Sequence, residues 1–119
     1  MPRSWRITRN REIRTLLQRG KRSRTGHLDV FASASPVPYP RAGVIVPRYK
    51  HDVVARNRVK RRLREILRRV VLPALRTRGM ALDLLVRARR EAYAASYREL
   101  ERELEGWLER VGGRGSSSI

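Results

Sequence analysis

The chain has 119 residues, 40% of them hydrophobic, and its 29 Lys and Arg residues against 11 Asp and Glu residues give a net charge of +18. This length is enough for one domain and too short for two of ordinary size. The absence of cysteine excludes disulfides, thiolate zinc sites and a cysteine nucleophile, and there is no apolar run of the length that a signal peptide or a membrane span needs. We therefore expect a soluble cytoplasmic protein with no membrane contact that binds a polyanion, with nucleic acid as the first choice.

The first half of the chain predicts a helix followed by two strands. Residues 8–19 have the spacing of a short amphipathic helix that begins at Thr8 and ends at Gly20. Residues 27–34 alternate with the period of a half-buried strand. Its apolar face is Leu28, Val30 and Ala32, and its other face is His27, Asp29, Phe31 and Ser33. The proline-rich residues 35–40 then predict a stiff connection to a short apolar strand over residues 42–47.

The second half predicts a long basic helix, a strand and a final helix. The basic helix is expected to begin at Asp52, to be kinked or divided by Pro73, and to end at Gly79. Its apolar positions fall within a sector of roughly 100°; they are Val59, Leu63, Ile66, Leu67 and Val70. Residues 81–88 alternate as a strand, with the basic residues Arg87 and Arg89 mostly on its polar side.

The last helix is predicted from a capping box formed by Ser96 and Glu99. Its apolar stripe consists of Leu100, Leu104, Trp107, Leu108 and Val111, and Gly112 is expected to end it. The sequence thus predicts one RNA-binding α/β domain over residues 1–111 and a flexible tail over residues 112–119.

The segment RNRVKRRLRE, residues 56–65, is the strongest functional signal, because it combines a high density of cations with a clear apolar stripe. Arginine forks clamp phosphates, and an amide such as that of Asn57 both donates to and accepts from a base edge or a 2′-hydroxyl. The alternatives are that the arginines form a solvated face and that Asn57 bonds only to its own backbone. A second RNR at residues 9–11 lacks this context.

Phe31 is the aromatic residue of most interest, since strand alternation places it on the polar face of its strand. There it would stack on an unpaired base, or else the helix over residues 8–19 covers it. Neither histidine and none of Asp29, Asp52 and Asp83 has the spacing of a metal site or of an acid and base pair, and no P-loop or nucleophile elbow is present. We therefore expect no protein active site, and we assign no residue as a metal ligand.

RAGVIV (41–46) followed by ARNRVKRRLRE (55–65) resembles the protein subunit of bacterial ribonuclease P, and HLDVF (27–31) and DLLVRAR (83–89) extend the resemblance over nearly the whole chain. The resemblance implies a two-layer α/β sandwich of the ribosomal protein S5 domain 2-like type. Its central sheet would be mostly antiparallel, and the RNR helix would lie in a left-handed βαβ crossover. It also implies that the protein assists a catalytic RNA, which holds most of the Mg²⁺, in removing the 5′ leader of precursor tRNA.

The resemblance further assigns two sets of residues. The set expected to contact the RNA subunit is Arg56, Asn57, Arg58, Lys60, Arg61, Arg64 and Arg68. The set expected to contact the leader is Phe31, Ile13, Leu17, Arg48, Arg87 and Arg89. The chain departs from the family pattern at His51, where glycine is common, and at Ile13 and Leu17, where phenylalanine is favoured.

Other functions remain open from the residues alone. The first is a small ribosomal or RNA-chaperone protein with the same basic helix. A DNA-binding nucleoid or helix-turn-helix protein would need two short helices joined by a tight turn, whereas strands flank this helix, and DNA is not the expected partner. A protein-only nuclease would need a cluster of carboxylates that the sequence lacks.

Overall fold

The computed structural model describes residues 3–117, and the burial of side chains within residues 3–111. A four-stranded sheet has the order β1-β2-β4-β3, in which only the β3–β4 pair is parallel. The strands are β1 (Lys21–Arg24), β2 (Leu28–Ala34), β3 (Arg41–Ile45) and β4 (Leu82–Ala88), and the α-helices are α1 (Asn10–Arg19), α2 (Val53–Ile66), α3 (Leu72–Thr77) and α4 (Tyr97–Ser117). The predicted mixed α/β class is confirmed, and β3, α2, α3 and β4 form the expected parallel crossover.

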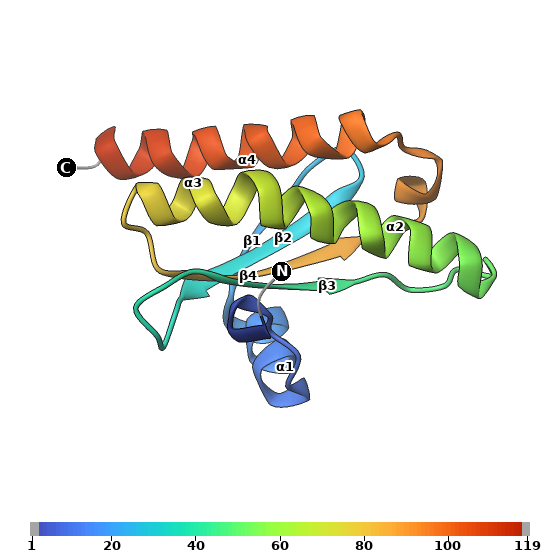
Figure 1. Ribbon diagram of the computed structural model, residues 1–119, viewed down its shortest axis with the longest axis horizontal. Helices are drawn as coiled ribbons and strands as arrows, with labels where there is room; N and C mark the ends of the chain where they lie inside the picture. Colours follow the sequence, from blue (N-terminus) through green and yellow to red (C-terminus); the bar gives the residue numbers. More distant parts are fainter. Residues whose placement is uncertain (1–2, 118–119) are drawn as a thin grey trace.

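Helices α2, α3 and α4 cover one face of the sheet, and α1 lies on the other face (Figure 1). The main core lies between the sheet and the three helices, and it contains the predicted apolar sides of β2 and β4 together with the stripes of α2 and α4. A smaller core lies under α1 and consists of Ile7, Leu16, Phe31 and Leu85. The sheet therefore separates a large apolar layer from a small one.

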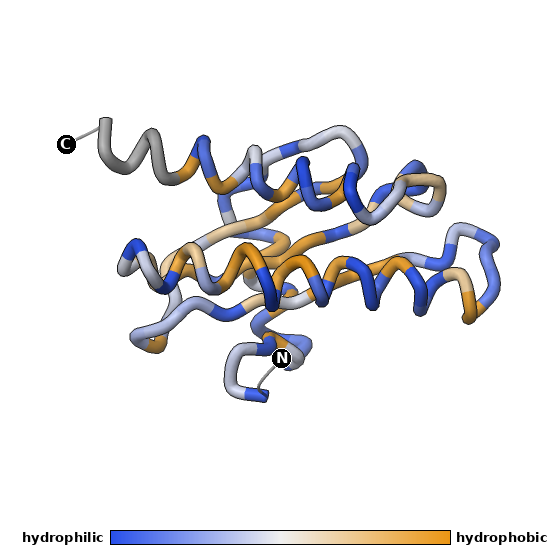
Figure 2. The backbone as a smooth tube through the Cα atoms, turned by 45° about the horizontal axis from the view of Figure 1, so that its top comes forward, coloured by the Kyte–Doolittle hydropathy of each residue, from blue (hydrophilic) through white to orange (hydrophobic). Residues whose placement is uncertain are grey.

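The basic helix α2 begins where Asp52 accepts a hydrogen bond from the amide of Ala55 at 2.8 Å, so the predicted N-cap is confirmed. Val59, Leu63 and Ile66 are buried on its inner side. Figure 2 shows hydrophobic and hydrophilic residues recurring along successive turns of the helix. Burial of this one stripe fixes the rotation of α2, so that Arg58, Arg61 and Arg64 face outward.

The basic helix is divided at the predicted place. A π-helical turn over Leu67–Val71 joins α2 to α3, and Pro73 lies in the first turn of α3. Proline has no amide to donate to the preceding turn, and the wider π turn accommodates that gap. Beyond α3, Gly79 has a φ of +68°, and the amide of Met80 returns to the carbonyl of Leu75 at 2.9 Å, which ends the helix as expected.

Three features differ from the sequence expectations. Helix α1 begins after Arg9, which makes no side-chain cap, rather than at Thr8. Strand β1 was not predicted, because KRSR has no apolar alternation and lies at an edge of the sheet, where β2 alone pairs with it. Helix α4 continues through Gly112 to Ser117 instead of ending there, and residues 118–119 of the predicted tail lie outside the described residues.

Gly20 ends α1 as predicted, but the reason is space rather than a positive φ. Its φ is −66°, whereas a Cβ at this position would lie 2.6 Å from the carbonyl oxygen of Leu16 and 3.3 Å from Cβ of Phe31. Only glycine lets the end of α1 approach β2 this closely. The position of α1 over the sheet therefore depends on this residue.

Candidate nucleic-acid interface

The outer side of α2 and of the π-helical turn that follows it carries a band of exposed basic and polar side chains that we call the α2 face. Its members are Asn57, Arg58, Arg61, Arg64 and Arg68. The half-buried Lys60 adjoins it, and burial first, then the charges of Arg56 and Arg64, lower the pKa of its amine below the usual value. Such mutual repulsion among cations is relieved by a polyanion, so the geometry fits phosphate binding.

Three arginines of α2 and the π-helical turn also bind the protein itself. Arg56 donates to the carbonyl of Val46 at 2.8 Å, and Arg62 donates to that of Ala95 at 3.0 Å. Arg68 pairs with Glu65 at 2.5 Å, and this pairing, mainly through the hydrogen bond, raises the pKa of the guanidinium and lowers that of the carboxyl. Arg56 and Arg62 therefore anchor α2 to its neighbours, and Arg58, Arg61 and Arg64 carry most of the outward charge.

A second basic cluster lies on the α1 side of the sheet, around the buried carboxylate of Asp29. Arg22 contacts it at 3.3 Å, and Arg87 and Arg89 each do so at 3.2 Å. Burial alone would raise the pKa of Asp29, but hydrogen bonds from Arg87 and Arg22 and the charges of Arg22 and Arg89 hold it below its ordinary value. Three cations around one anion leave this cluster with net positive charge.

Phe31 does not present a free ring to solvent. It is 4% exposed and packs under α1 with Leu16, while Ile13 and Leu17 lie half-buried against the same small core. The guanidinium of Arg87 lies 5.1 Å from the centre of its ring. Of the two alternatives drawn from the sequence, the structure shows the second: α1 covers the ring, which is not open for stacking.

Helix α1 is tied to the sheet by an ionic network that the sequence did not predict. Arg41 of β3 bonds both carboxylate oxygens of Asp83, at 3.0 and 2.7 Å, and also Glu12 of α1 at 2.7 Å. The hydrogen bonding to Asp83 contributes most to raising the pKa of the Arg41 guanidinium. The bond to Glu12 holds α1 at a fixed place beside β3.

The two predicted sets of residues approach each other beside α1. Arg64 of α2 and Ile13 of α1 line the same pocket, together with residues 42–44 of β3. Arg87 and Arg89 meet at Asp29, whereas Arg48 lies in the turn between β3 and α2. The structure therefore brings the two sets onto neighbouring surfaces, with Arg48 at the end of α2.

Sequence reasoning missed Arg22 and the role of Asp29, because both depend on strand register. Asp29 pairs with Arg87 on β4 and with Arg24 on β1, so Arg22 reaches it diagonally. An aspartate among apolar strand residues is the one signal that indicated a buried ionic partner. Its partners become clear only when the pairing of the strands is known.

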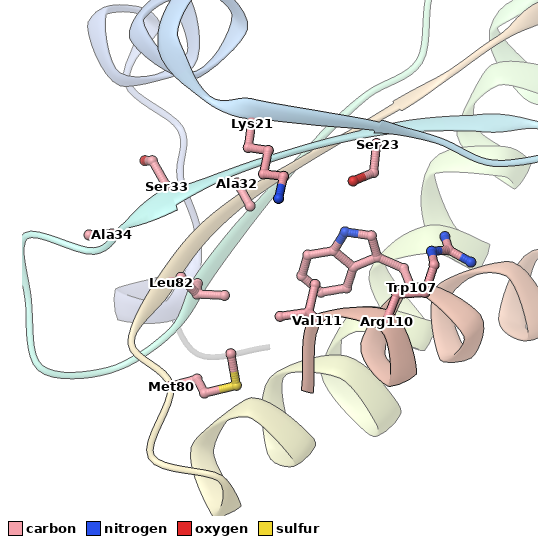
Figure 3. Close-up of a pocket in the computed structure, with 10 residues that line it drawn as sticks. All are labelled: Lys21, Ser23, Ala32, Ser33, Ala34, Met80, Leu82, Trp107, Arg110 and Val111. Atoms are coloured by element: carbon pink, nitrogen blue, oxygen red, sulfur yellow. The ribbon is translucent and has the colours of Figure 1, made fainter. Parts of the chain in front are cut away.

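A separate pocket lies on the other side of the sheet, between α4 and strands β1 and β2 (Figure 3). Trp107, Val111, Leu82 and Met80 give it an apolar lining, and Lys21 and Arg110 add two cations. None of its lining residues belongs to the α2 face or to the Asp29 cluster.

Within residues 3–111, no three His, Asp or Glu side chains are grouped so that they could hold a metal ion. No helix among the described residues has the length and apolar character to cross a membrane.

The family model described as Ribonuclease P matches residues 1–112. The ribonuclease P protein component of Acidothermus cellulolyticus is 36% identical over 115 residues, covering 93% of this chain and 91% of the relative. That of Streptomyces avermitilis is 33% identical and covers 98% of each chain. The solved RNase P proteins of Staphylococcus aureus and Thermotoga maritima share the fold. The S. aureus protein matches with a TM-score of 0.72 at 22% identity, over 90% of this chain and 94% of its own. The T. maritima protein matches with a TM-score of 0.71 at 23% identity, over 88% of this chain and 96% of its own. With the family model covering almost all of it, the chain belongs to the ribonuclease P protein family.

Proposed function

We propose that this chain binds the RNA subunit of ribonuclease P through the α2 face and takes no part in bond cleavage itself. The observation that carries the proposal is the contrast between the two sides of α2. Val59, Leu63 and Ile66 are buried on one side, and Arg58, Arg61 and Arg64 are exposed on the other. Packing of the apolar stripe on the core holds α2 in place. Its outward arginines can therefore contact several phosphates at little entropic cost.

We further propose that the 5′ leader of precursor tRNA lies along the α1 side of the sheet. Arg22 and Arg87 supply cations for the phosphates, and the half-buried Ile13 and Leu17 supply apolar contact for the bases. Phe31 supports this surface from below, since its ring lies under α1. The pocket shared by Arg64 and Ile13 links the two surfaces, so one protein would contact the catalytic RNA and the leader together.

The chemistry is proposed to belong to the RNA, with Mg²⁺ held mainly by its phosphates. Among residues 3–111, Asp29 and Asp83 form ion pairs with arginines and Asp52 caps α2. No three His, Asp or Glu side chains in this range are grouped as a metal site. The protein's contribution is then electrostatic, because its cations offset the repulsion between two RNA backbones. This predicts that the protein lowers the Mg²⁺ concentration that cleavage requires.

Reconstitution tests the proposal. The transcribed RNA subunit from the same genome is incubated with precursor tRNA, with and without the full chain, over a series of Mg²⁺ concentrations. We expect cleavage at lower Mg²⁺ when the chain is present and none with the chain alone. Arg61→Ala should weaken this effect, whereas Arg102→Ala removes the same charge from the exposed side of α4 and should not. Equal effects of the two variants would contradict the α2 face.

A small ribosomal or RNA-chaperone protein is the second candidate, because the basic helix and the fold would serve ribosomal RNA equally well. Leader cleavage that does not depend on the chain would favour this candidate. Membership of the ribonuclease P protein family favours the first.

A further inference from the structure

The turn between β3 and α2 has an unusual backbone. Tyr49 and Lys50 follow one another with φ values of +47° and +70°, in the left-handed region that residues with a side chain avoid. Two successive non-glycine residues there need support from the surrounding structure. Such conformations gather at functional sites, where the strain serves to hold a side chain in place.

The support comes from the neighbouring elements. The hydroxyl of Tyr49 donates to the carbonyl of Ala88 at 3.3 Å, and that of Tyr93 donates to the carbonyl of Pro47 at 2.6 Å. Burial raises the pKa of the Tyr93 hydroxyl, so it remains a donor well above neutral pH. Tyr93 belongs to η3 (Arg90–Ala94), which lies at the same end of the molecule as the start of α2 (Figure 1).

What this framework holds in place is the imidazole of His51. Its ring stacks on that of Tyr93 with centroids 3.8 Å apart and planes within 6°, and Tyr49 meets Tyr93 edge-on at 6.3 Å. Tyr93 is half-buried, whereas His51 is exposed. One face of the imidazole is therefore backed by a fixed aromatic ring, and the residue stays open to solvent.

The turn itself does not require an aromatic side chain at this position. His51 contributes to it through its backbone, since its amide donates to the carbonyl of Arg48 at 2.7 Å and its carbonyl accepts from the Arg48 side chain at 3.4 Å. Any residue except proline would supply these two backbone groups. The ring is thus an addition to the turn rather than part of its hydrogen bonding.

Cations and exposed apolar residues lie around the turn that carries His51. Arg48 and Lys50 are exposed in the same turn, and the guanidinium of Arg90 lies 5.5 Å from the ring centre of Tyr49. The nearby acids have partners already, because Asp52 caps α2 and Glu91 lies 3.4 Å from Arg89. Beside them are the exposed large hydrophobics Val53 and Val54, which are 51% and 67% exposed.

A flat ring fixed from behind, with unneutralised cations beside it, has the chemistry that recognises an unpaired base and its phosphates. We propose that His51, backed by Tyr93, is a stacking platform for one unpaired RNA base, with the adjoining phosphates on Lys50 and Arg48. The platform rests on the proposed function and deepens it, because it extends the α2 face beyond the start of the helix. The base comes either from the RNA subunit or from the leader of the precursor tRNA.

The test uses the full chain bound to its transcribed RNA subunit, with and without precursor tRNA. Acylation of 2′-hydroxyls reports the flexibility of each nucleotide. We expect one unpaired nucleotide to be immobilised by the wild type and by His51→Phe, which keeps a flat ring, and to be released by His51→Leu, which fills the space without one. His51→Leu should also weaken RNA binding roughly 5- to 150-fold, the usual loss for one stacked base.

Each outcome of this experiment either supports or overturns the platform. An immobilised nucleotide in the RNA subunit, or one in the leader, identifies the source of the base and supports the platform. Unchanged acylation in His51→Leu, or release of the nucleotide by His51→Phe as well, overturns the platform while the proposed function stands. A wild-type chain that fails to bind the RNA subunit overturns both. Thermal unfolding of each variant shows whether the domain remains folded. Because His51→Phe and His51→Leu both replace the imidazole and only the first keeps a flat ring, a difference between them reports on stacking rather than on the stability of the turn.

Discussion

Replacing Asp29 should destabilise the protein more than replacing any surface acid, because three arginines converge on its carboxylate. Arg22 is 51% exposed, so its contact resembles a surface pair and contributes at most about 1 kcal/mol. Arg87 and Arg89 are one-third exposed or less, and charged hydrogen bonds of that kind contribute about 1.5 kcal/mol each. Asparagine keeps the shape and one acceptor, so we expect Asp29→Asn to cost about 2–3 kcal/mol, or roughly 8–15 °C in Tm.

The loss should depend on pH with a definite sign. The pKa of Asp29 in the folded protein lies below its ordinary value of 3.8, so the unfolded chain takes up a proton first as the pH falls. The carboxylate's contribution is then complete above about pH 5 and declines as the pH passes through the lowered folded pKa. The difference in unfolding free energy between wild type and Asp29→Asn should accordingly be constant near neutrality and shrink in acid.

Urea unfolding followed by circular dichroism at a series of pH values measures this difference. Glu91→Gln is the matched control, because it removes a carboxylate that contacts Arg89 at 3.4 Å but is 59% exposed. Its effect should stay below about 0.5 kcal/mol. The assignment of Asp29 as the centre of the cluster would be refuted by either of two results. One is an unfolding free energy of Asp29→Asn within about 1 kcal/mol of the wild-type value, and the other is a difference in unfolding free energy that does not change with pH.

Three further results are expected. Raising salt from 50 to 200 mM should weaken binding to the RNA subunit by roughly 10³-fold if about six phosphates are neutralised, and a flat response in filter binding would contradict a basic interface. Arg61→Ala should weaken binding to the RNA subunit and remain folded by circular dichroism. Leu63→Asp should unfold the domain, because it places an unpaired charge in the core. Unfolding of Arg61→Ala would disprove the orientation of α2. Phe31→Ala should lower the unfolding free energy by about 3–4 kcal/mol because the ring is 4% exposed, and a loss below about 1 kcal/mol in urea would show that the ring is not core.

Much of the fold followed from periodicity and capping chemistry. Alternation placed Leu28 and Val30 correctly in the main core, and the stripe through Val59 and Leu63 fixed which side of α2 is buried. The capping box is present as expected, since the amide of Glu99 donates to Ser96 at 3.1 Å. These signals are local, so the sequence alone was sufficient to read them.

The remainder depended on contacts between distant segments. Alternation placed Phe31 on the outer face of β2, but only the position of α1, set by Gly20 and the Arg41–Glu12 bond, decides that the ring is covered. The edge strand β1 is too polar for its period to be seen. The stack of His51 on Tyr93 likewise joins a turn and the short helix η3, which neither motif nor spacing connects.

The central claim is that the α2 face holds the RNA subunit of ribonuclease P, and the RNA that accompanies the chain in cells tests it most directly. The tagged full chain is purified from its own cells, and the bound RNA is sequenced beside that of the Arg58→Ala, Arg61→Ala double variant. We predict a single abundant structured RNA, identifiable as the ribonuclease P RNA, with the wild type and its depletion with the variant. Ribosomal RNA alone, or equal recovery with both proteins, would contradict the account.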